Sequence, residues 1–447
     1  MSRTLVRALG VLLALALAAA GCADDGDDGD AGSDDDGGTP ASEEIDYEAI
    51  GLWDDGPCDE AAEPLVVGLI TTFESPAISL GDQATALEAA ADAFNERGGA
   101  NGACIEVHNC DEQNNADKAL ACVDEMDKAG VMVTINDQGL QSQLEVSEAF
   151  AAAGIPRLAG NVTNNDWGDQ NAYPLDASGT GSTFLMPQVL IDAGAKEIGI
   201  IRVGGGAAAM KGLLKPVYAD DGATFVYDGE VPEGTTDFTQ FIQGAEAANA
   251  TGVMLALGEQ EAVQVVDAAQ QLGTDLTIGG TLGTFSHSSV TDMGDFAEQM
   301  ALTWSYPPAT TDLPVYQALR SDMAASGEDA LQPENLKASP MRSWIGLYGL
   351  LYMLRDAQVT DLSRETIKAT IEAAKDVPML GMFGDESWTP DTDHPGLFQR
   401  AGMNHWASYE WDPEAEGEFD GNFVEVAEMS FDDITCGSIL GAPAETC

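Results

Sequence analysis

The feature of this sequence that most constrains its fold is a regular alternation of apolar, strand-like runs with amphipathic helical segments. The first run, Pro64–Thr71, is almost entirely apolar, as is typical of a strand buried on both faces of a parallel sheet. In the segment that follows, 81–97, the side chains of Leu87, Ala91 and Phe94 share one helical face. Parallel strands joined by such crossover helices form a doubly wound sheet.

Two series of this kind succeed each other along the chain. The first predicts strands at 64–71, 105–108, 131–136 and 155–159, with helices at 81–97, 115–128 and 140–153. The second predicts strands at 197–203, 224–231, 252–257 and 276–279, with helices at 207–219, 237–249 and 260–272. We therefore expect an α/β fold of two doubly wound parallel-sheet lobes joined by a hinge.

The remaining segments indicate how the lobes connect. Stretches rich in Pro, Gly, Ser and Thr near 174–182 and 303–311 are expected to link them. Helices predicted at 314–325, 343–357 and 363–374 have no strands between them and should return to the first lobe, while strand-like runs in 380–432 should join the second. The predicted boundaries are 64–177 plus about 309–379 for the N-terminal lobe, and 178–308 plus about 380–447 for the C-terminal lobe.

The first 22 residues have the order of parts found in an export signal. Two arginines are followed by an apolar stretch, 9–20, that is too short to span a bilayer stably. The next residues, Ala19-Ala-Gly-Cys22, resemble a bacterial lipobox, although Ala19 stands where that pattern usually has Leu. The resemblance implies a signal peptide over 1–21 and a lipid on the Cys22 thiol. The alternative is an ordinary secretory signal with an accidental cysteine.

The strongly negative net charge argues against nucleic acid and anionic membrane surfaces as partners. The 447 residues include 18 Lys or Arg and 76 Asp or Glu, for a formal net charge of −58. Such a chain lacks the clustered basic side chains that bind nucleic acid or an anionic membrane surface. Residues 22–63 are predicted as a lipid anchor and a flexible acidic tether, because 23–48 contain 12 acidic residues and no basic ones.

Most of the negative charge nevertheless belongs to the globular part. Without the 12 acidic residues of 23–48 and the two arginines of the signal, 64 acidic and 16 basic residues remain, a net charge of −48. Charge spread this widely exceeds what a ligand site requires. We interpret it as an adaptation to a saline habitat, because salt shortens the range of electrostatic repulsion.

Six cysteines remain once Cys22 is assigned to lipid, and an even number in an exported chain favours disulfides. Several connectivities are possible, and the preferred pairing is Cys58–Cys104, Cys110–Cys122 and Cys436–Cys447. The first pair precedes two strands that are expected to be neighbours, and the second would clip a strand to the helix that follows it. Metal binding is the rival, but the sequence has no C-x-x-C pair and only four His, so no metal or other cofactor is expected.

Several motifs, taken in order, resemble type I periplasmic binding proteins, and among them the leucine/isoleucine/valine-binding group of ABC importers. The resemblance rests on Val66-Val-Gly-Leu-Ile-Thr-Thr, Leu80-Gly-Asp-Gln, Phe94-Asn-Glu-Arg-Gly-Gly-Ala-Asn-Gly, Asp111–Ala119, Ile155–Thr163 and Thr236-Asp-Phe. It covers roughly residues 64–440. It implies a ligand between two lobes, permease and ATPase partners, and no enzymatic activity.

Ligands of open α/β sheets lie beyond the carboxyl ends of the strands, where helix N-termini present N–H donors. By resemblance, the loops after the third and fourth strands supply contacts that suit a ligand carboxylate, from Gln141, Ser142, Val162 and Thr163. Gln141 and Ser142 could instead cap the next helix. Phe73 and Glu74, in the first loop, are expected either to face the cleft or to lie in solvent.

Three positions depart from the family pattern. Leu80 replaces an aromatic residue expected before the first helix. The second-lobe loop that often offers Tyr contains Glu259, Gln260 and Glu261, and Thr281 falls where an acidic residue typically holds the ligand's ammonium group. Glu259 or Glu261 would have to supply that charge. Without it, a short amide, another carboxylate or a small aromatic acid replaces an α-amino acid as the expected ligand.

The function implied by the resemblance is that of a substrate-binding lipoprotein of an ABC importer. It would be a monomer, anchored to the outer face of the bacterial cytoplasmic membrane, that closes around a small solute. A lipid-anchored sensor that signals to a receptor is an alternative. A remote one is a dinucleotide-dependent oxidoreductase, because Gly204–Ala209 fits a loose G-x-G-x-x-A pattern and Asp228 follows about 20 residues later. The hydrolase motifs G-x-S-x-G and H-E-x-x-H do not occur in the sequence.

Overall fold

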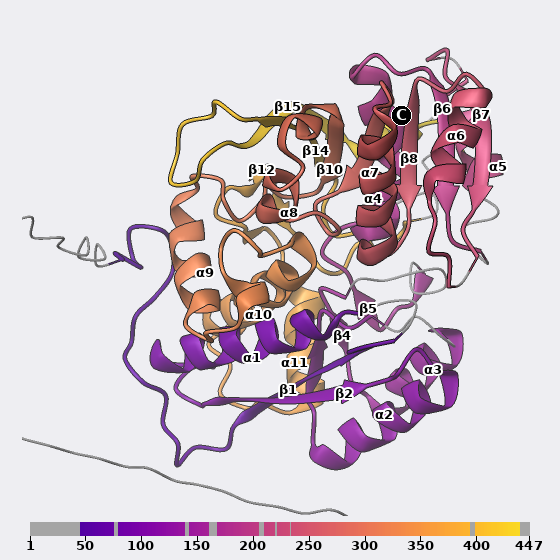
Figure 1. Cartoon of the computed structure of the whole chain (residues 1–447). Coiled ribbons are helices and arrows are strands. Elements are labelled where there is room, and N and C mark those ends of the chain that lie inside the picture. The colour runs from indigo at the N-terminus through magenta and orange to yellow at the C-terminus, as the bar shows by residue number, and fades with distance from the viewer. Residues whose placement is uncertain are drawn as a thin grey trace, which may run out of the picture. The chain divides into compact units, whose positions relative to one another are not determined.

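Two large sheets, each with its own helices, make up most of the α/β fold (Figure 1), and a small two-stranded sheet accompanies them. The computed structural model describes residues 45–75, 79–138, 143–160, 168–204, 210–219, 221–232, 234–393 and 398–438. The first sheet has the order β2-β1-β3-β4-β5, and every neighbouring pair is parallel. Its elements are β1 (Leu65–Thr71), α1 (Gly81–Glu96), β2 (Ile105–Asp111), α2 (Ala116–Ala129), β3 (Val133–Ile135), α3 (Gln143–Ala153), β4 (Arg157–Leu158) and β5 (Ala172–Tyr173).

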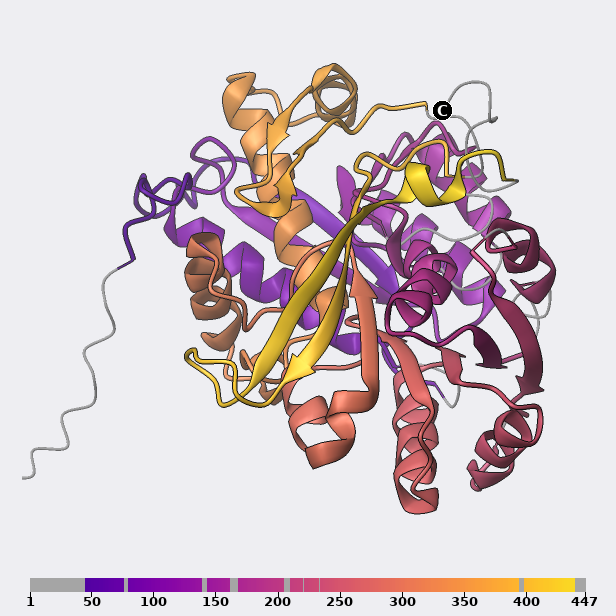
Figure 2. The same cartoon turned by 90° about the horizontal axis from the view of Figure 1, so that it is seen from above.

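The second sheet has the order β15-β14-β10-β9-β8-β6-β7. Its elements are α4 (Ser178–Asp192), β6 (Glu197–Arg202), α5 (Met210–Val217), β7 (Thr224–Glu230), α6 (Thr239–Ala247), β8 (Gly252–Ala256), α7 (Glu259–Leu272), β9 (Thr277–Thr281), α8 (His287–Thr291), η3 (Gly294–Gln299), β10 (Met300–Trp304), β14 (His405–Asp412) and β15 (Asn422–Ser430). The strands β6 to β10 pair in parallel, whereas β14 and β15 are antiparallel and lie beside β10 as long arrows in Figure 2. The predicted pair of doubly wound parallel-sheet lobes is confirmed.

Between β10 and β14 the chain forms helices that lie against the first lobe. The elements of this part are α9 (Pro314–Ala324), η4 (Asp329–Leu331), α10 (Ala338–Asp356), α11 (Arg364–Ala373), β11 (Val377–Pro378), β12 (Met382–Asp385) and β13 (Ser387–Trp388), and β11 pairs with β13 in an antiparallel two-stranded sheet. The last helix, α12 (Phe431–Thr435), packs on β15 and α4 of the second lobe. Both α9 and α10 pack against α1 (Figure 1). The chain therefore crosses between the lobes after β5, after β10, and again between β13 and β14.

Helix α4 was not expected, because the sequence analysis assigned 174–182 to a connection. The helix contains two Gly in its first turns and Pro187 farther on, and its buried side chains face β8, β9 and β10. A helix that is buried on most sides has no polar face, so it shows no amphipathic period. The neighbouring strand β10 was also missed, since 303–311 was predicted to be a connection.

Helix α10 begins at Ala338, before the predicted start at Ser343. Almost all of its residues are buried, including the whole of the apolar run Ile345–Leu354 apart from the half-buried Tyr352. No helix in the described ranges combines the length and the apolar character needed to cross a membrane.

Residues 45–63, which the prediction includes in the tether, are packed on the first lobe. Leu52 and Trp53 are buried. The Trp53 ring lies 5.8 Å from the Phe94 ring and 6.1 Å from the Tyr348 ring, and the Arg355 guanidinium covers it at 4.6 Å. A segment with these contacts is part of the folded body, so the flexible tether does not extend to residue 63.

Two predicted disulfides are confirmed. Cys58 pairs with Cys104, and Cys110 pairs with Cys122. Cys58–Cys104 joins the packed N-terminal segment to the start of β2, and Cys110–Cys122 joins the end of β2 to α2. Cys436 is disulfide-bonded, but its predicted partner, Cys447, lies outside the described residues.

Candidate functional site

Buried polar side chains gather at the carboxyl ends of β1 and β3. Thr71 and Gln83 are fully buried. The Thr71 hydroxyl donates to Gln83 Oε1 (3.4 Å), and Gln83 Nε2 donates to Gln138 Oε1 (3.1 Å). These bonds tie the end of β1 to the start of α1 and to the loop after β3, at the edge where doubly wound sheets bind ligands.

Asn136, directly after β3, extends this group toward α10. Its φ of 53° is left-handed, a conformation that a short polar side chain tolerates. Asn136 Nδ2 donates to Ser339 O (3.0 Å) and to Ser343 Oγ (2.9 Å), whereas Asn136 Oδ1 is buried without a hydrogen-bond partner. We call Thr71, Gln83, Asn136 and Gln138 the polar floor.

A buried ion pair fixes the next residue of the same loop. Asp137 Oδ2 lies 2.8 Å from Nε and 2.7 Å from Nη2 of Arg157 on β4. Asp137 Oδ1 accepts a hydrogen bond from the Thr134 hydroxyl (3.2 Å). Both charged side chains are buried, so the carboxylate positions the loop.

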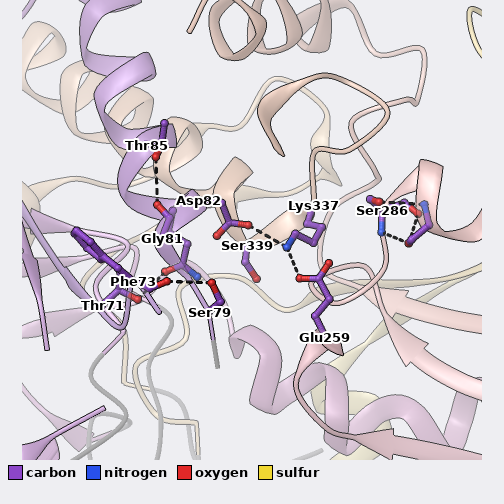
Figure 3. Close-up of polar contacts among 12 residues, drawn as sticks. Thr71, Phe73, Ser79, Gly81, Asp82, Thr85, Glu259, Ser286, Lys337 and Ser339 are labelled. Carbon is purple, nitrogen blue, oxygen red and sulfur yellow. Dashed lines mark hydrogen bonds and ion pairs between the residues drawn. The ribbon is translucent and has the colours of Figure 1, made fainter. Parts of the chain in front are cut away.

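Lys337, the residue before α10, places its ammonium between carboxylates of the two lobes (Figure 3). Its Nζ lies 3.0 Å from Oδ2 of Asp82 on α1 and 2.6 Å from Oε2 of Glu259, the first residue of α7. The exposed fractions of the side chains are 13% for Lys337, 12% for Asp82 and 48% for Glu259. We call these three residues the bridge.

The backbone beside Lys337 is bonded to the second lobe. Ala338 N donates to Leu282 O (3.0 Å), and Ser288 N donates to Glu334 O (2.8 Å). Since α10 itself packs against α1, Lys337 lies where the two lobes meet. Burial alone would lower the pKa of the Lys337 ammonium, but the charges of Asp82 and Glu259 outweigh burial and raise the pKa, so the side chain is protonated at neutral pH.

The three lobe crossings are joined by a second group of polar side chains. Asp176, after β5, accepts hydrogen bonds from Arg342 Nη2 on α10 (2.7 and 3.0 Å) and from the hydroxyl of Ser305, which follows β10. Ser305 O lies 2.9 Å from Nδ1 of His405, at the end of the third crossing. Asp176 and Arg342 are fully buried. We call Asp176, Ser305, Arg342 and His405 the hinge network.

Tyr306 connects the hinge network to the start of α10. Its hydroxyl donates to Ala338 O (2.7 Å). Burial raises the pKa of Tyr306 to about 12, although the Arg342 guanidinium beside it acts in the opposite direction. The first residues of α10 therefore contact the crossings, and the residue just before them carries the bridge ammonium.

A family model for periplasmic binding proteins matches residues 64–405. The chain belongs to this family. A comparison of the sequence with curated proteins found no match.

Solved structures show the same fold in other periplasmic binding proteins. A solute-binding protein of an ABC transporter from R. palustris, in complex with 4-hydroxybenzoate, is 15% identical with a TM-score of 0.66, over 82% of this chain and 97% of that chain. A possible leucine/isoleucine/valine-binding protein from Rhodopirellula baltica SH 1 is 15% identical (TM-score 0.65, 84% and 98% covered). A fatty acid ABC transporter substrate-binding protein from Thermomonospora curvata is 17% identical (TM-score 0.65, 83% and 93% covered).

The first-lobe residues expected at the ligand site fall into two groups. Phe73 and Leu80 are half-buried at the entrance to α1, where Phe73 O accepts a hydrogen bond from Gly81 N (3.2 Å), and Glu74 is exposed. Leu80 directly precedes helix α1, which carries Asp82 in its first turn, and Figure 3 shows Phe73 beside the start of that helix. The other expected residues, and the expected lipidation site, lie outside the described residues: Gln141, Ser142, Val162, Thr163 and Cys22.

The second-lobe residues expected at the site open α7 or end β9. Glu259 reaches the first lobe through the bridge, whereas Gln260 is exposed and Glu261 is half-buried. Thr281 is largely buried, and its hydroxyl lies 3.1 Å from that of Thr284. The charge of Glu259, considered for a ligand ammonium, is thus already paired with Lys337.

Sequence reasoning did not identify Lys337 or Asp82 as site residues. Lys337 is one of only 18 basic residues and directly precedes the buried helix α10, which is a signal that could have found it. The helix was predicted to start several residues later, so Lys337 was assigned to no element. Asp82 was recognised only as part of the motif at the start of the first predicted helix.

The dinucleotide pattern finds no support in the described residues. Most of Gly204–Ala209 lies outside them. Asp228 Oδ1 accepts a hydrogen bond from Arg202 Nε (2.8 Å), so this carboxylate is paired within the sheet. The described ranges also contain no group of three or more His, Cys, Asp or Glu side chains that could hold a metal ion.

Proposed function

We propose that this protein is the substrate-binding lipoprotein of an ABC importer, which captures a small amino-acid-like, carboxylate or amide solute between its lobes by hinge closure. The bridge is the observation that carries the proposal. Its three side chains come from both lobes, and Asp82 directly precedes Gln83 of the polar floor. A solute bound there contacts both lobes at once and therefore favours the closed arrangement.

Family membership and the structural relatives support this function. Of the relatives described above, one is a solute-binding protein in complex with 4-hydroxybenzoate, one is named as a fatty acid transporter substrate-binding protein, and one as a possible leucine/isoleucine/valine-binding protein. Each of these solutes is small and carries a carboxylate. Their common fold with this chain makes such compounds the first set to test.

In this proposal Gln141, Ser142, Val162 and Thr163 supply the first-lobe contacts to the solute. The N-terminal lobe comprises 64–177 plus about 309–379, and the C-terminal lobe comprises 178–308 plus about 380–447. The binding protein acts as a monomer. Solute-induced closure creates the surface that docks on the permease.

Lipid on Cys22 would hold the protein on the outer face of the cytoplasmic membrane, beside the permease and ATPase subunits. More than one acyl chain on that residue is enough for stable anchoring. Replacement of Cys22 with Ser should release the protein from membranes into the medium. Membrane retention of that variant would contradict the anchor.

A thermal-shift screen at high NaCl concentration tests the binding function. The panel contains amino acids, their amides, and small aliphatic and aromatic acids. We expect at least one class to raise the unfolding temperature in a concentration-dependent way, because a ligand that binds only the native state stabilises it. Lys337→Met should reduce the shift at a given solute concentration, whereas Glu246→Gln, an exposed change on α6, should keep it. A panel without any stabilising compound would contradict the proposal.

A further inference from the structure

We infer that the Cys110–Cys122 disulfide is a positioning element of the solute site, because it holds the turn after β2, and this turn holds the loop after β1. Solute affinity then depends on this bond and not on the Cys58–Cys104 disulfide. The inference rests on the proposed function, since it assumes that the solute binds beyond the carboxyl ends of the first-lobe strands.

The turn after β2 has a backbone conformation that needs support. Gln113 and Asn114 follow each other with φ of 52° and 49°, in the left-handed region that residues other than glycine disfavour. The turn lies between Cys110, at the end of β2, and Cys122 on α2, and the two cysteines are only 12 positions apart. A cross-link this short restricts the other conformations open to the segment. The disulfide therefore stabilises the turn as it stands.

The turn is hydrogen-bonded to the loop after β1. Phe73 N donates to Asp111 Oδ1 (3.0 Å), and the Thr72 hydroxyl donates to Glu112 Oε1 (3.0 Å). The same hydroxyl accepts a hydrogen bond from Asn114 N (3.2 Å). Thr72 and Glu112 are fully buried, so water cannot readily replace these bonds. The first two residues of the loop after β1 are thus fixed by the turn after β2.

These two residues in turn fix the start of α1. Leu80 N donates to Thr72 O (2.9 Å), and Gly81 N donates to Phe73 O (3.2 Å; Figure 3). Thr72 directly follows Thr71 of the polar floor, and the first turn of α1 carries the first-lobe carboxylate of the bridge. A change in the turn after β2 would therefore reach the polar floor and the bridge together.

The other disulfide lies at the opposite end of the same strand. Cys104 directly precedes β2, and its bond to Cys58 holds the packed N-terminal segment at the amino end of the strand. These two cysteines are 46 positions apart, against 12 for Cys110 and Cys122. In the chain-entropy model a bond that closes the longer loop contributes more to stability. The two bonds are therefore expected to rank in opposite order for stability and for affinity.

Calorimetric titration of two double variants tests this reversal. The probe is the amino acid, amide or small acid of the screening panel that binds the unmodified protein most tightly. We expect Cys110→Ser/Cys122→Ser to lower its affinity about tenfold, because fewer molecules hold the binding-competent loop. Cys58→Ser/Cys104→Ser should change affinity by less than about twofold while lowering the unfolding temperature more.

The outcomes separate the inference from the proposed function. Unchanged affinity in Cys110→Ser/Cys122→Ser, or a larger loss of affinity in Cys58→Ser/Cys104→Ser, would overturn the inference and leave the proposed function intact. A panel in which no compound binds the unmodified protein would overturn the proposed function, and the inference with it.

Asp111→Ala tests the same connection without replacing a cysteine. It removes the oxygen that accepts from Phe73 N and from Gln113 N, both at 3.0 Å, and should lower affinity severalfold. Asp117→Ala makes the same change in net charge at an exposed position on the first turn of α2 and should leave affinity unchanged. Equal affinities of these two variants would overturn the inference. This comparison decides the matter if a cysteine variant fails to fold.

Discussion

The hinge network and the bridge both set a cation from the start of α10 against carboxylates, but in opposite surroundings. Arg342 and Asp176 are fully buried and are tied to all three crossings through Ser305 and His405. Lys337 and Glu259 join the lobes where Glu259 is about half exposed. The two groups are adjacent in sequence and are connected through Tyr306 and Ala338.

The difference in burial assigns the hinge network mainly to the stability of the fold and the bridge mainly to the contact between the lobes. A buried ion pair leaves a desolvated charge behind when one partner is removed, so the hinge network is tied to folding. In the bridge only Glu259 is about half exposed, so its pairing with Lys337 contributes little to the free energy of unfolding, and Glu259 is the partner that a ligand can replace. The start of one helix therefore carries both a fully buried ion pair at the crossings and a partly solvated ion pair between the lobes.

Removal of the hinge cation should have the largest effect. We expect Arg342→Leu to lower the free energy of unfolding by about 3–5 kcal/mol, because Asp176 stays buried without its partner. Arg355→Leu, on the exposed end of the same helix, should cost only about 1 kcal/mol. Urea unfolding at a fixed salt concentration measures both, and similar losses for the two variants would break the distinction between buried and exposed pairs.

Removal of the bridge cation should affect binding and stability together, with a smaller loss of stability than Arg342→Leu. We expect Lys337→Met to lower the free energy of unfolding by about 1–3 kcal/mol, because Asp82 is left largely buried without its partner whereas Glu259 is solvated. Affinity for the best solute of the screen should fall by about tenfold or more. Calorimetry and urea unfolding on the same sample distinguish the two effects. A large stability loss with unchanged affinity would assign Lys337 to the structural group.

The pH dependence of the stability of Lys337→Met gives a further test, in which the expected effect is smaller. The pKa of Lys337 is raised above its ordinary value of 10.5, so the charged form is favoured in the native state. Its contribution to stability is fully present below pH 10.5 and is lost as the pH rises through the raised value. The stability difference between the unmodified protein and Lys337→Met should therefore persist at pH 9 and shrink at higher pH. A difference that disappears near neutral pH would contradict the bridge.

The alternating strands and helices of both lobes were predicted well, because continuous apolar runs and amphipathic helices are local signals in the sequence. The sequence also predicted two disulfides from the expected adjacency of β1, β2 and α2. Helix α4 was not predicted, because its glycines and Pro187 lower the local helix propensity. Packing against the strands β8 to β10 stabilises this helix instead.

The site was harder to predict than the fold. Lys337 and Glu259 are far apart in sequence, and their contact depends on how α10 and α7 are placed by both lobes. Sequence reasoning identified the loop of Glu259 from family resemblance, but it could not show that the carboxylate is paired. Asp82 Oδ1 is buried without a hydrogen-bond partner, which is a consequence of tertiary packing and has no local signature.

Measurement of the distance between the lobes tests the account most directly. Spin labels at Lys118→Cys on α2 and Glu246→Cys on α6, both exposed, report that distance by pulsed electron paramagnetic resonance. We predict that a solute shown by calorimetry to bind shifts the distance distribution to shorter values, and that Glu259→Gln lengthens it in the solute-free protein. A bound solute that leaves the distribution unchanged would contradict capture by hinge closure.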